Sequence, residues 1–319
     1  MIRNYILTLA TVVFCTTLSA QQDPQFTQWF MDPVASNIAA AGQSELTNVN
    51  GFYRNQWVNL DRAPVTSLFN IDGKLNFMPG AFGIQFYQDE LGHESNTMAK
   101  LGYVYQFDPF SGGTQVSLGA SVSYFTKKLG NEWVSIDPWQ DDIAIPNSQT
   151  TSSSADLDLG LFISNPKKFY AGLSMTHLMQ NELADMSITP TRHYYAMTGF
   201  NIPLSGDILV LRNNILAKTD FNAGAVDFNM NVIYDDMLWA GVSWRPQDAF
   251  APVAGFQYRT VKKEPTSYSE QVFRVGYSYD ITTSKLQTYS DGSHEVFLSY
   301  GFKFESTPIL NRYSNPRFL

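Results

Sequence analysis

The sequence predicts an all-β protein, a single antiparallel transmembrane β-barrel of about fourteen strands with long extracellular loops and short periplasmic turns. Over 116–124, 226–235 and 294–304, every second residue is large and apolar, whereas the residues between are mostly small or polar. This is the period of a strand with one apolar and one polar face. The apolar face is rich in Tyr, Phe and Trp, as expected where strands meet lipid.

Composition agrees with a membrane barrel. Charged residues make up 16% of the chain, against about 25% in soluble proteins. The mean hydropathy of -0.18 and the lack of a run of about 20 apolar residues after the N-terminus exclude a bundle of membrane helices. A soluble periplasmic β-sandwich is the remaining alternative, and it would need a second sheet over the aromatic face.

The N-terminus has the features of a signal peptide, expected over residues 1–20. Arg3 supplies the charge, residues 6–14 form an apolar core, and Leu18-Ser19-Ala20 precedes a cleavage point near Gln21. Its removal changes the formal net charge from -8 to -9, which argues against a nucleic-acid partner. The only cysteine, Cys15, lies inside the apolar core, so lipidation is disfavoured and the mature chain has no disulfide.

Residues 21–44 form an N-terminal segment that we expect to act as a plug or a docking element. Prolines at 24 and 33 exclude a regular strand or helix, and the aromatic residues between them are too apolar for a free tail. The segment would pack into the barrel mouth or bind a partner. Its candidate contact residues are Asp23, Pro24, Phe26, Trp29, Phe30, Met31, Asp32 and Pro33.

The barrel is expected over 45–304, followed by a periplasmic tail over 305–319. Short connections separate strands on the periplasmic side, whereas 130–153, 180–191 and 282–293 are long outer loops. Since an open edge is unstable in lipid, the last strand should pair with the first. The expected strands are 45–57, 66–75, 80–91, 96–108, 114–129, 154–165, 168–179, 192–204, 207–220, 226–235, 237–246, 251–262, 269–281 and 294–304.

The longest loop, 130–153, contains Trp133 and Trp139 and three acids, Asp137, Asp141 and Asp142. It is interpreted as a solvated loop whose aromatic residues rest on the barrel rim, with a contact surface or a cation site as alternatives. The acids lack the spacing of a calcium-binding loop, so no metal is assigned.

Charged residues on the polar phase are expected to face the lumen, because a charge on the lipid face costs free energy. Their mixed signs favour structural salt bridges over an ion pathway. Ser121→Arg on this face should be milder than an arginine on the lipid face if the lumen has room. The inward set is Arg54, Lys100, Asp158, Asp227, Arg245, Arg259, Arg274, Asp280 and Lys303.

The sequence carries no catalytic motif, so no catalytic, cofactor-binding or metal-binding residue is assigned and no cofactor is expected. The four histidines, His93, His177, His193 and His294, form no His-Glu-x-x-His pair, and no Gly-x-Ser-x-Gly elbow is present. His294 and Glu295 should face opposite sides of one strand. His193 and the adjacent Arg192 are expected at a strand end at the membrane interface.

A set of short motifs, found in one order from about residue 22 to the C-terminus, resembles the PorP/SprF family of Bacteroidetes outer-membrane proteins. The motifs are QDPQFTQWFMDP followed by AAAG, then FYRNQW at 52–57, APVT at 63–66, RHYY at 192–195, GYSYD at 276–280, GSHE at 292–295 and PRF at 316–318. The chain departs from the expected pattern by ending in Phe318-Leu319. The motif residues expected to be structural are Arg54, Asn55, Gln56, Trp57, Arg192, His193, Tyr279, Asp280, His294 and Glu295.

The resemblance implies an accessory component of type IX protein secretion or gliding motility in the bacterial outer membrane. Implied partners are membrane lipid, subunits of the secretion machinery and a secreted surface protein such as an adhesin. The competing function is a passive outer-membrane channel for small or hydrophobic solutes.

Overall fold

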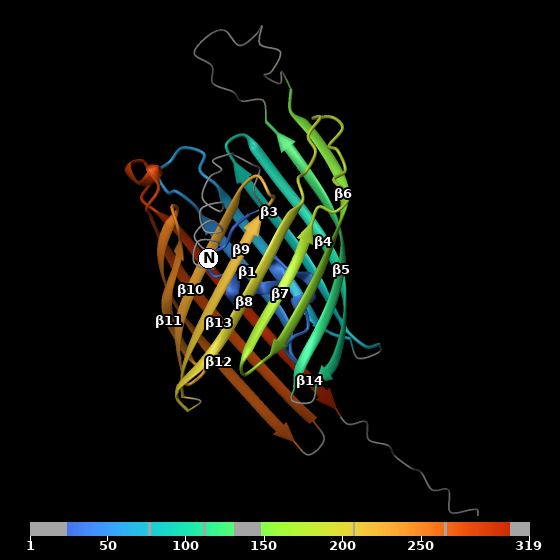
Figure 1. Cartoon of the computed structure of the whole chain (residues 1–319), viewed down its shortest axis with the longest axis vertical. Helices are drawn as coiled ribbons and strands as arrows, with labels where there is room; N and C mark the ends of the chain where they lie inside the picture. The colour runs from blue at the N-terminus through green and yellow to red at the C-terminus, as the bar shows by residue number, and fades with distance from the viewer. Residues whose placement is uncertain are drawn as a thin grey trace, which may run out of the picture.

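The strands of the computed structural model close into one antiparallel barrel (Figure 1), in which each strand pairs with its sequence neighbours and β14 pairs with β1. The structure describes residues 24–75, 78–110, 113–130, 148–206, 208–264 and 267–306. The expected signal peptide, Asp23, the aromatic and acidic residues of the loop over 131–147, and the tail from 307 lie outside the described residues. None of the described helices is long and apolar enough to cross a membrane.

The fourteen strands confirm the expected fold class. The largest shift of a boundary is at β6, which begins four residues earlier than expected because Thr150 pairs with Leu129 of β5. The strands are β1 Thr47–Asn55, β2 Val65–Lys74, β3 Ala81–Leu91, β4 Glu94–Phe110, β5 Thr114–Leu129, β6 Thr150–Asn165, β7 Phe169–Thr176, β8 His193–Ser205, β9 Leu209–Thr219, β10 Gly224–Tyr234, β11 Leu238–Arg245, β12 Ala249–Glu264, β13 Ser267–Thr282 and β14 Ser293–Ser306.

The alternation of the sequence sets the two faces of the wall. In β5, Leu118, Val122 and Tyr124 are 50%, 55% and 58% exposed, whereas Ser121 and Ser123 between them are buried. Because consecutive side chains of a strand point to opposite sides, the exposed row faces lipid and the buried row faces the lumen. Closure follows as expected from the sequence, with β1 and β14 paired from Thr47↔Phe302 to Asn55↔His294.

The two ends of the barrel differ. The longer connections between described strands, such as 56–64, 177–192 and 283–292, lie at the end where β1 stops and β14 starts, which is uppermost in Figure 1. Outer-membrane barrels have long loops outside and short turns in the periplasm. We therefore refer to this end as the outer end and to the opposite end as the inner end.

The N-terminal segment runs through the lumen from the outer end to the inner end. Three short 3-10 helices, η1 Trp29–Met31, η2 Pro33–Ala35 and η3 Ile38–Ala40, follow one another along it. Near its start, Gln25 Nε2 donates to Asp248 Oδ2 in the outer turn between β11 and β12 (3.0 Å). Near its end, Gly42 N–H donates to Asp72 Oδ2 near the inner end of β2 (2.9 Å). In Figure 1 this segment is coloured blue and is enclosed by the strands of the barrel.

Arginine substitutions test which face of the strands meets lipid and which faces the lumen. Val122→Arg and Val232→Arg, on the lipid face near strand centres, should each cost about 2 to 4 kcal/mol and impair assembly. Urea unfolding in detergent and the gel shift of unheated samples measure the effect. Val261→Arg is the matched control, because Val261 pairs with the inward Glu270 near the inner end and is exposed. Equal losses at all three positions would contradict the assignment of faces.

The room on which a milder effect of Ser121→Arg depends is absent from the structure. Ser121 is buried and its hydroxyl donates to Asp158 Oδ2 (3.1 Å), which also pairs with Lys100 (2.6 Å). The lumen at this height is filled, so an arginine would overpack it at a cost of about 1 to 3 kcal/mol.

Candidate functional site

A buried ionic cluster fixes the start of the N-terminal segment to the outer half of the wall. Arg54 of β1 lies at its centre, with Nη2 2.7 Å from Asp280 Oδ2 of β13 and Nη1 3.1 Å from Glu295 Oε2 of β14. Their side chains are 1%, 1% and 0% exposed, respectively. Three motifs that lie far apart in the sequence thus meet at one point inside the barrel.

The N-terminal segment contributes backbone and side-chain groups to the same cluster. The N–H groups of Thr27 and Gln28 donate to the two carboxylate oxygens of Glu295, each at 2.7 Å. The Thr27 hydroxyl donates to Asp280 Oδ1 (2.8 Å) and accepts a hydrogen bond from Arg54 Nη1 (2.9 Å). Charge-assisted bonds of this kind are stronger than neutral ones, so they hold residues 27 and 28 firmly against the wall.

A second arginine completes the cluster on the opposite side of Asp280. Arg245 of β11 lies 2.5 Å from Asp280 Oδ2, 2.8 Å from Asp248 Oδ2 and 3.6 Å from Asp227 Oδ1. The cluster therefore joins β1, β10, β11, β13 and β14 to the N-terminal segment. Breaking a buried ion pair by removing one partner is strongly destabilising, because the other charge is left uncompensated.

Aromatic rings pack directly beneath the ionic cluster. The Phe26 ring lies 5.0 Å from Phe52 of β1, which lies 4.8 Å from Phe297 of β14. Trp29 and Phe30 are also buried, with their rings in edge contact at 6.2 Å. Since β1 and β14 form the seam that closes the barrel, the first half of the segment packs on both sides of this seam.

Small residues allow the second half of the segment to lie close to the wall. Ala39 and Ala41 have no exposed surface, and a Cβ added to Gly119 of β5 would lie 2.7 Å from the backbone nitrogen of Ala39. Asn37 Nδ2 donates to the carbonyl oxygens of Leu161 and Leu173 at 3.1 and 3.2 Å. The run of alanines ahead of Gly42 therefore corresponds to close packing of backbone against strands β3 to β7.

Asp32 is a buried acid in the middle of the segment. Asn70 Nδ2 of β2 donates to its Oδ2 atom (2.5 Å). Burial raises the pKa of Asp32 from 3.8 to about 6, against the opposing effect of the hydrogen bonds. Between these two values the folded protein keeps a proton that the unfolded chain has released, so the stability contributed by this group falls as the pH rises through that window.

This pKa shift gives a testable pH dependence. Asp32→Asn cannot ionise, so the free energy of unfolding of the wild type should fall relative to this variant by about 2 to 3 kcal/mol between pH 4 and pH 7. Urea unfolding of both proteins at the two pH values measures the difference. Parallel pH profiles would contradict the shift.

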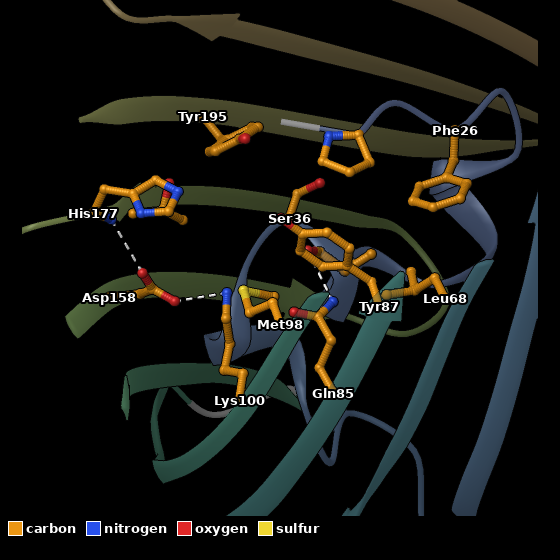
Figure 2. Close-up of a pocket in the computed structure, with 13 residues that line it drawn as sticks. Phe26, Ser36, Leu68, Gln85, Tyr87, Met98, Lys100, Asp158, His177 and Tyr195 are labelled. Atoms are coloured by element: carbon orange, nitrogen blue, oxygen red, sulfur yellow. Dashed lines mark hydrogen bonds and ion pairs between the residues drawn. The ribbon is translucent and has the colours of Figure 1, made fainter. Parts of the chain in front are cut away.

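Above the segment, the outer part of the lumen opens into a small pocket shown in Figure 2. Phe26, Ser36 and Leu68 form part of its lining, and Lys100 and Asp158, which also line it, form an ion pair. The backbone N–H of His177 donates to Asp158 Oδ1 (3.2 Å). Gln85 Nε2 donates to the carbonyl oxygen of Ala35 (3.3 Å), which links the wall to η2.

The remaining residues of the N-terminal set and the predicted lumen charges lie in different environments. Pro24 lines the outer pocket, Met31 packs against the buried core and Pro33 begins η2. Arg274 Nε donates to Gln257 Oε1 (2.6 Å), and Lys303 pairs with Glu45 and Glu305. Arg259 is 54% exposed and pairs with Glu270 (2.7 Å). The charged set therefore divides into the buried outer cluster, the separate, largely buried Lys100–Asp158 pair, the hydrogen-bonded Arg274, and the more exposed Arg259 and Lys303 pairs.

The other motif residues lie around the outer rim. Gln56 and Trp57 follow Asn55 at the end of β1, and the Trp57 N–H donates to Ser293 Oγ (3.0 Å). Tyr279 donates from its hydroxyl to the carbonyl oxygen of Asp291 (2.7 Å), and its ring contacts the exposed His294. His294 and Glu295 face opposite sides of β14, as expected from alternation.

His193 lies at a strand end, as expected, because β8 begins there. The structure corrects the expected environment of its side chain, which is buried and faces the lumen with its ring 5.9 Å from that of His177. Arg192, in contrast, is exposed, and its Nε donates to the carbonyl oxygen of Leu178 (3.1 Å). His193 starts β8 in the same phase of the alternation as the buried Tyr195 and Met197. This alternation in the sequence could have predicted an inward side chain.

Sequence reasoning missed Thr27, Gln28, Asn37 and Asp248. Thr27, Gln28 and Asn37 lie in the N-terminal segment and Asp248 lies in the turn between β11 and β12. Their roles in anchoring the segment depend on hydrogen bonds to residues far away in the sequence, which no local pattern indicates. Thr27 and Gln28 are interleaved with Phe26 and Trp29, and this mixture of polar and aromatic residues was the one available signal.

A known protein family matches most of the chain. The model of the family described as type IX secretion system membrane protein PorP/SprF matches residues 18–300. No curated protein matches the sequence at a significant level.

Several solved outer-membrane proteins are similar to the chain over most of its length. The CymD monoaromatic hydrocarbon channel has a TM-score of 0.45 at 10% identity, covering 91% of this chain and 94% of that chain. The Ralstonia pickettii toluene transporter TbuX has a TM-score of 0.45 at 9% identity, with 88% and 94% covered. The Acinetobacter baumannii protein Omp33 has a TM-score of 0.43 at 10% identity, with 82% and 100% covered. At these values the similarities carry no argument about function.

Proposed function

Since the chain belongs to the PorP/SprF family of type IX secretion membrane proteins, we propose that it supports the secretion or surface attachment of a partner protein, such as an adhesin. In this role the barrel is a rigid outer-membrane platform that holds the partner or couples it to other subunits of the secretion machinery. It performs no catalysis. Its outer end, where the loops and the start of the N-terminal segment come together, is the surface that meets the partner.

The observation that carries this proposal is the N-terminal segment inside the lumen. It reaches from the outer turn at Asp248 to Asp72 near the inner end and is fixed by the buried cluster around Arg54. A passive channel needs an open path, and a segment held in the lumen by charge-assisted hydrogen bonds obstructs that path. A platform gains rigidity, because the segment ties together strands on both sides of the closing seam.

The passive channel is the second candidate function. The barrel architecture itself is compatible with a channel, and a small pocket lies above the segment. A transport path would require the segment to leave the lumen, which means breaking the Glu295 and Asp280 contacts of Thr27. Glu295 and Asp280 would keep their arginine partners, but they would lose charge-assisted hydrogen bonds worth about 1.5 to 3 kcal/mol each, so the platform is favoured.

Two measurements test the proposed function. Deletion of the gene should remove one or a few proteins from the cell surface, as read by surface proteomics, and should leave uptake of small solutes unchanged. Protein reconstituted in planar bilayers should conduct poorly. Re-expression of the wild-type gene is the control for the first measurement, and a known porin in the same bilayers is the control for the second.

Large stable conductance together with an unchanged surface proteome would overturn the platform in favour of the channel. Loss of surface proteins alongside low conductance is the expected outcome.

A further inference from the structure

The outer end of the lumen contains a cavity of about 270 Å³ that the anchoring of the N-terminal segment does not use. Pro24, the first described residue, forms part of its wall. It adjoins the deeper pocket of Figure 2, with which it shares Pro24, Tyr87 and His177. The two together form a recess that reaches from the outer connection between β7 and β8 to Phe26, Ser36 and Leu68.

Most of the wall of this outer cavity is apolar. Leu91 and Phe125 come from β3 and β5, whereas Leu183, Ile188 and Pro190 come from the connection between β7 and β8. Leu91 is 46% exposed although it lines the cavity. Covering this apolar surface would remove it from water, which is favourable.

The cavity also carries negative charge. Glu94 pairs with the buried Lys127. Asp89 accepts a hydrogen bond from the Thr66 hydroxyl (2.6 Å), and among the described residues no Lys or Arg lies within ion-pair distance of it. A ligand that combines apolar surface with a positive charge would complement both features.

We propose that this cavity docks an extended segment of the secreted partner, with one apolar side chain in the cavity and a neighbouring Lys or Arg paired with Asp89. The inference rests on the proposed function and adds the chemistry of the contact. The cavity volume lies just below the range of about 300 to 1,000 Å³ usual for small-molecule sites, which fits one or two side chains. Lys127 acts electrostatically on Asp89 but is already paired with Glu94, so two acids share one lysine. A basic side chain would supply the second cation, whereas an apolar solute would not.

Site-specific photocrosslinking in intact cells tests the contact. p-Benzoylphenylalanine at Thr191, which lines the cavity, should form an adduct with a protein that is also lost from the surface of the deletion strain. Mass spectrometry should place the crosslink on an apolar residue next to a lysine or arginine of that protein. Asp89→Asn should lower the adduct yield by about fivefold to tenfold, because a partly desolvated charge pair is lost, and Asp89→Glu should restore most of it.

Matched variants separate the cavity from general effects on folding. Glu90→Gln alters the neighbouring acid on the other face of β3, and the adduct yield should stay unchanged. Thr191→Trp should fill the cavity and reduce display of the partner, whereas Thr151→Trp, at an exposed position outside the cavity, should not. All variants should retain the gel shift of the unheated wild type.

An adduct confined to this chain's own residues, or a crosslink abolished by toluene but insensitive to Asp89→Asn, would overturn the inference. So would equal display in the two tryptophan variants. These failures are distinct from failure of the proposed function, which shows as an unchanged surface proteome in the deletion strain.

Discussion

Replacing Arg54 with methionine should destabilise the folded barrel by about 3 to 5 kcal/mol, because it leaves Glu295 buried without its cation. Arg245 still neutralises Asp280 at 2.5 Å, but Glu295 would keep only the backbone donors of Thr27 and Gln28. The start of the N-terminal segment should then detach from the wall. Urea unfolding in detergent measures the stability, and limited proteolysis between Pro24 and Ser44 measures the release.

Two comparisons make the Arg54 experiment decisive. Arg259→Met removes an arginine that is 54% exposed and ion-paired to Glu270, and it should cost less than about 1 kcal/mol. Adding Glu295→Gln to Arg54→Met should recover part of the lost stability, because the uncompensated charge is then gone. Equal stability of the Arg54 and Arg259 variants would refute a structural role for the cluster.

The second large effect is expected from the aromatic residues of the segment. Phe26→Ala, Trp29→Ala and Phe30→Ala should each cost about 3 to 5 kcal/mol. The triple variant should lose less than their sum because the Trp29 and Phe30 rings are in contact. The sequence alone suggested that the triple variant would weaken display and leave the strands unaffected. The packing of Phe26 on Phe52 at the closing seam adds a loss of barrel stability.

A triple variant of lipid-facing residues controls for the loss of aromatic surface. Phe69, Phe86 and Trp244 have the same residue types and are exposed on the outer face of β2, β3 and β11. Their replacement with alanine should leave the lumen packing intact and cost much less. Surface proteomics and the urea midpoint should both separate the two triple variants, and similar losses in both would contradict the lumen assignment.

The sequence by itself determined the wall of the barrel. Alternation is a local property, because consecutive side chains of an extended chain must point to opposite faces. The fourteen strands, the lipid-facing row of Leu118, Val122 and Tyr124, and the inward Arg54 and Asp280 therefore follow from short stretches read one at a time. Closure between β1 and β14 also followed, since an unpaired edge is unstable in lipid.

Only the tertiary structure decided what fills the lumen and which charges meet there. The Thr27 N–H and the Glu295 carboxylate are 268 residues apart in the sequence, and their bond exists only once the barrel has closed around the segment. The same closure buries His193 and leaves no room at Ser121. Alternation fixes whether a side chain faces inward, but pairing and free space depend on the opposite wall and on the segment between, and neither is encoded in any single strand.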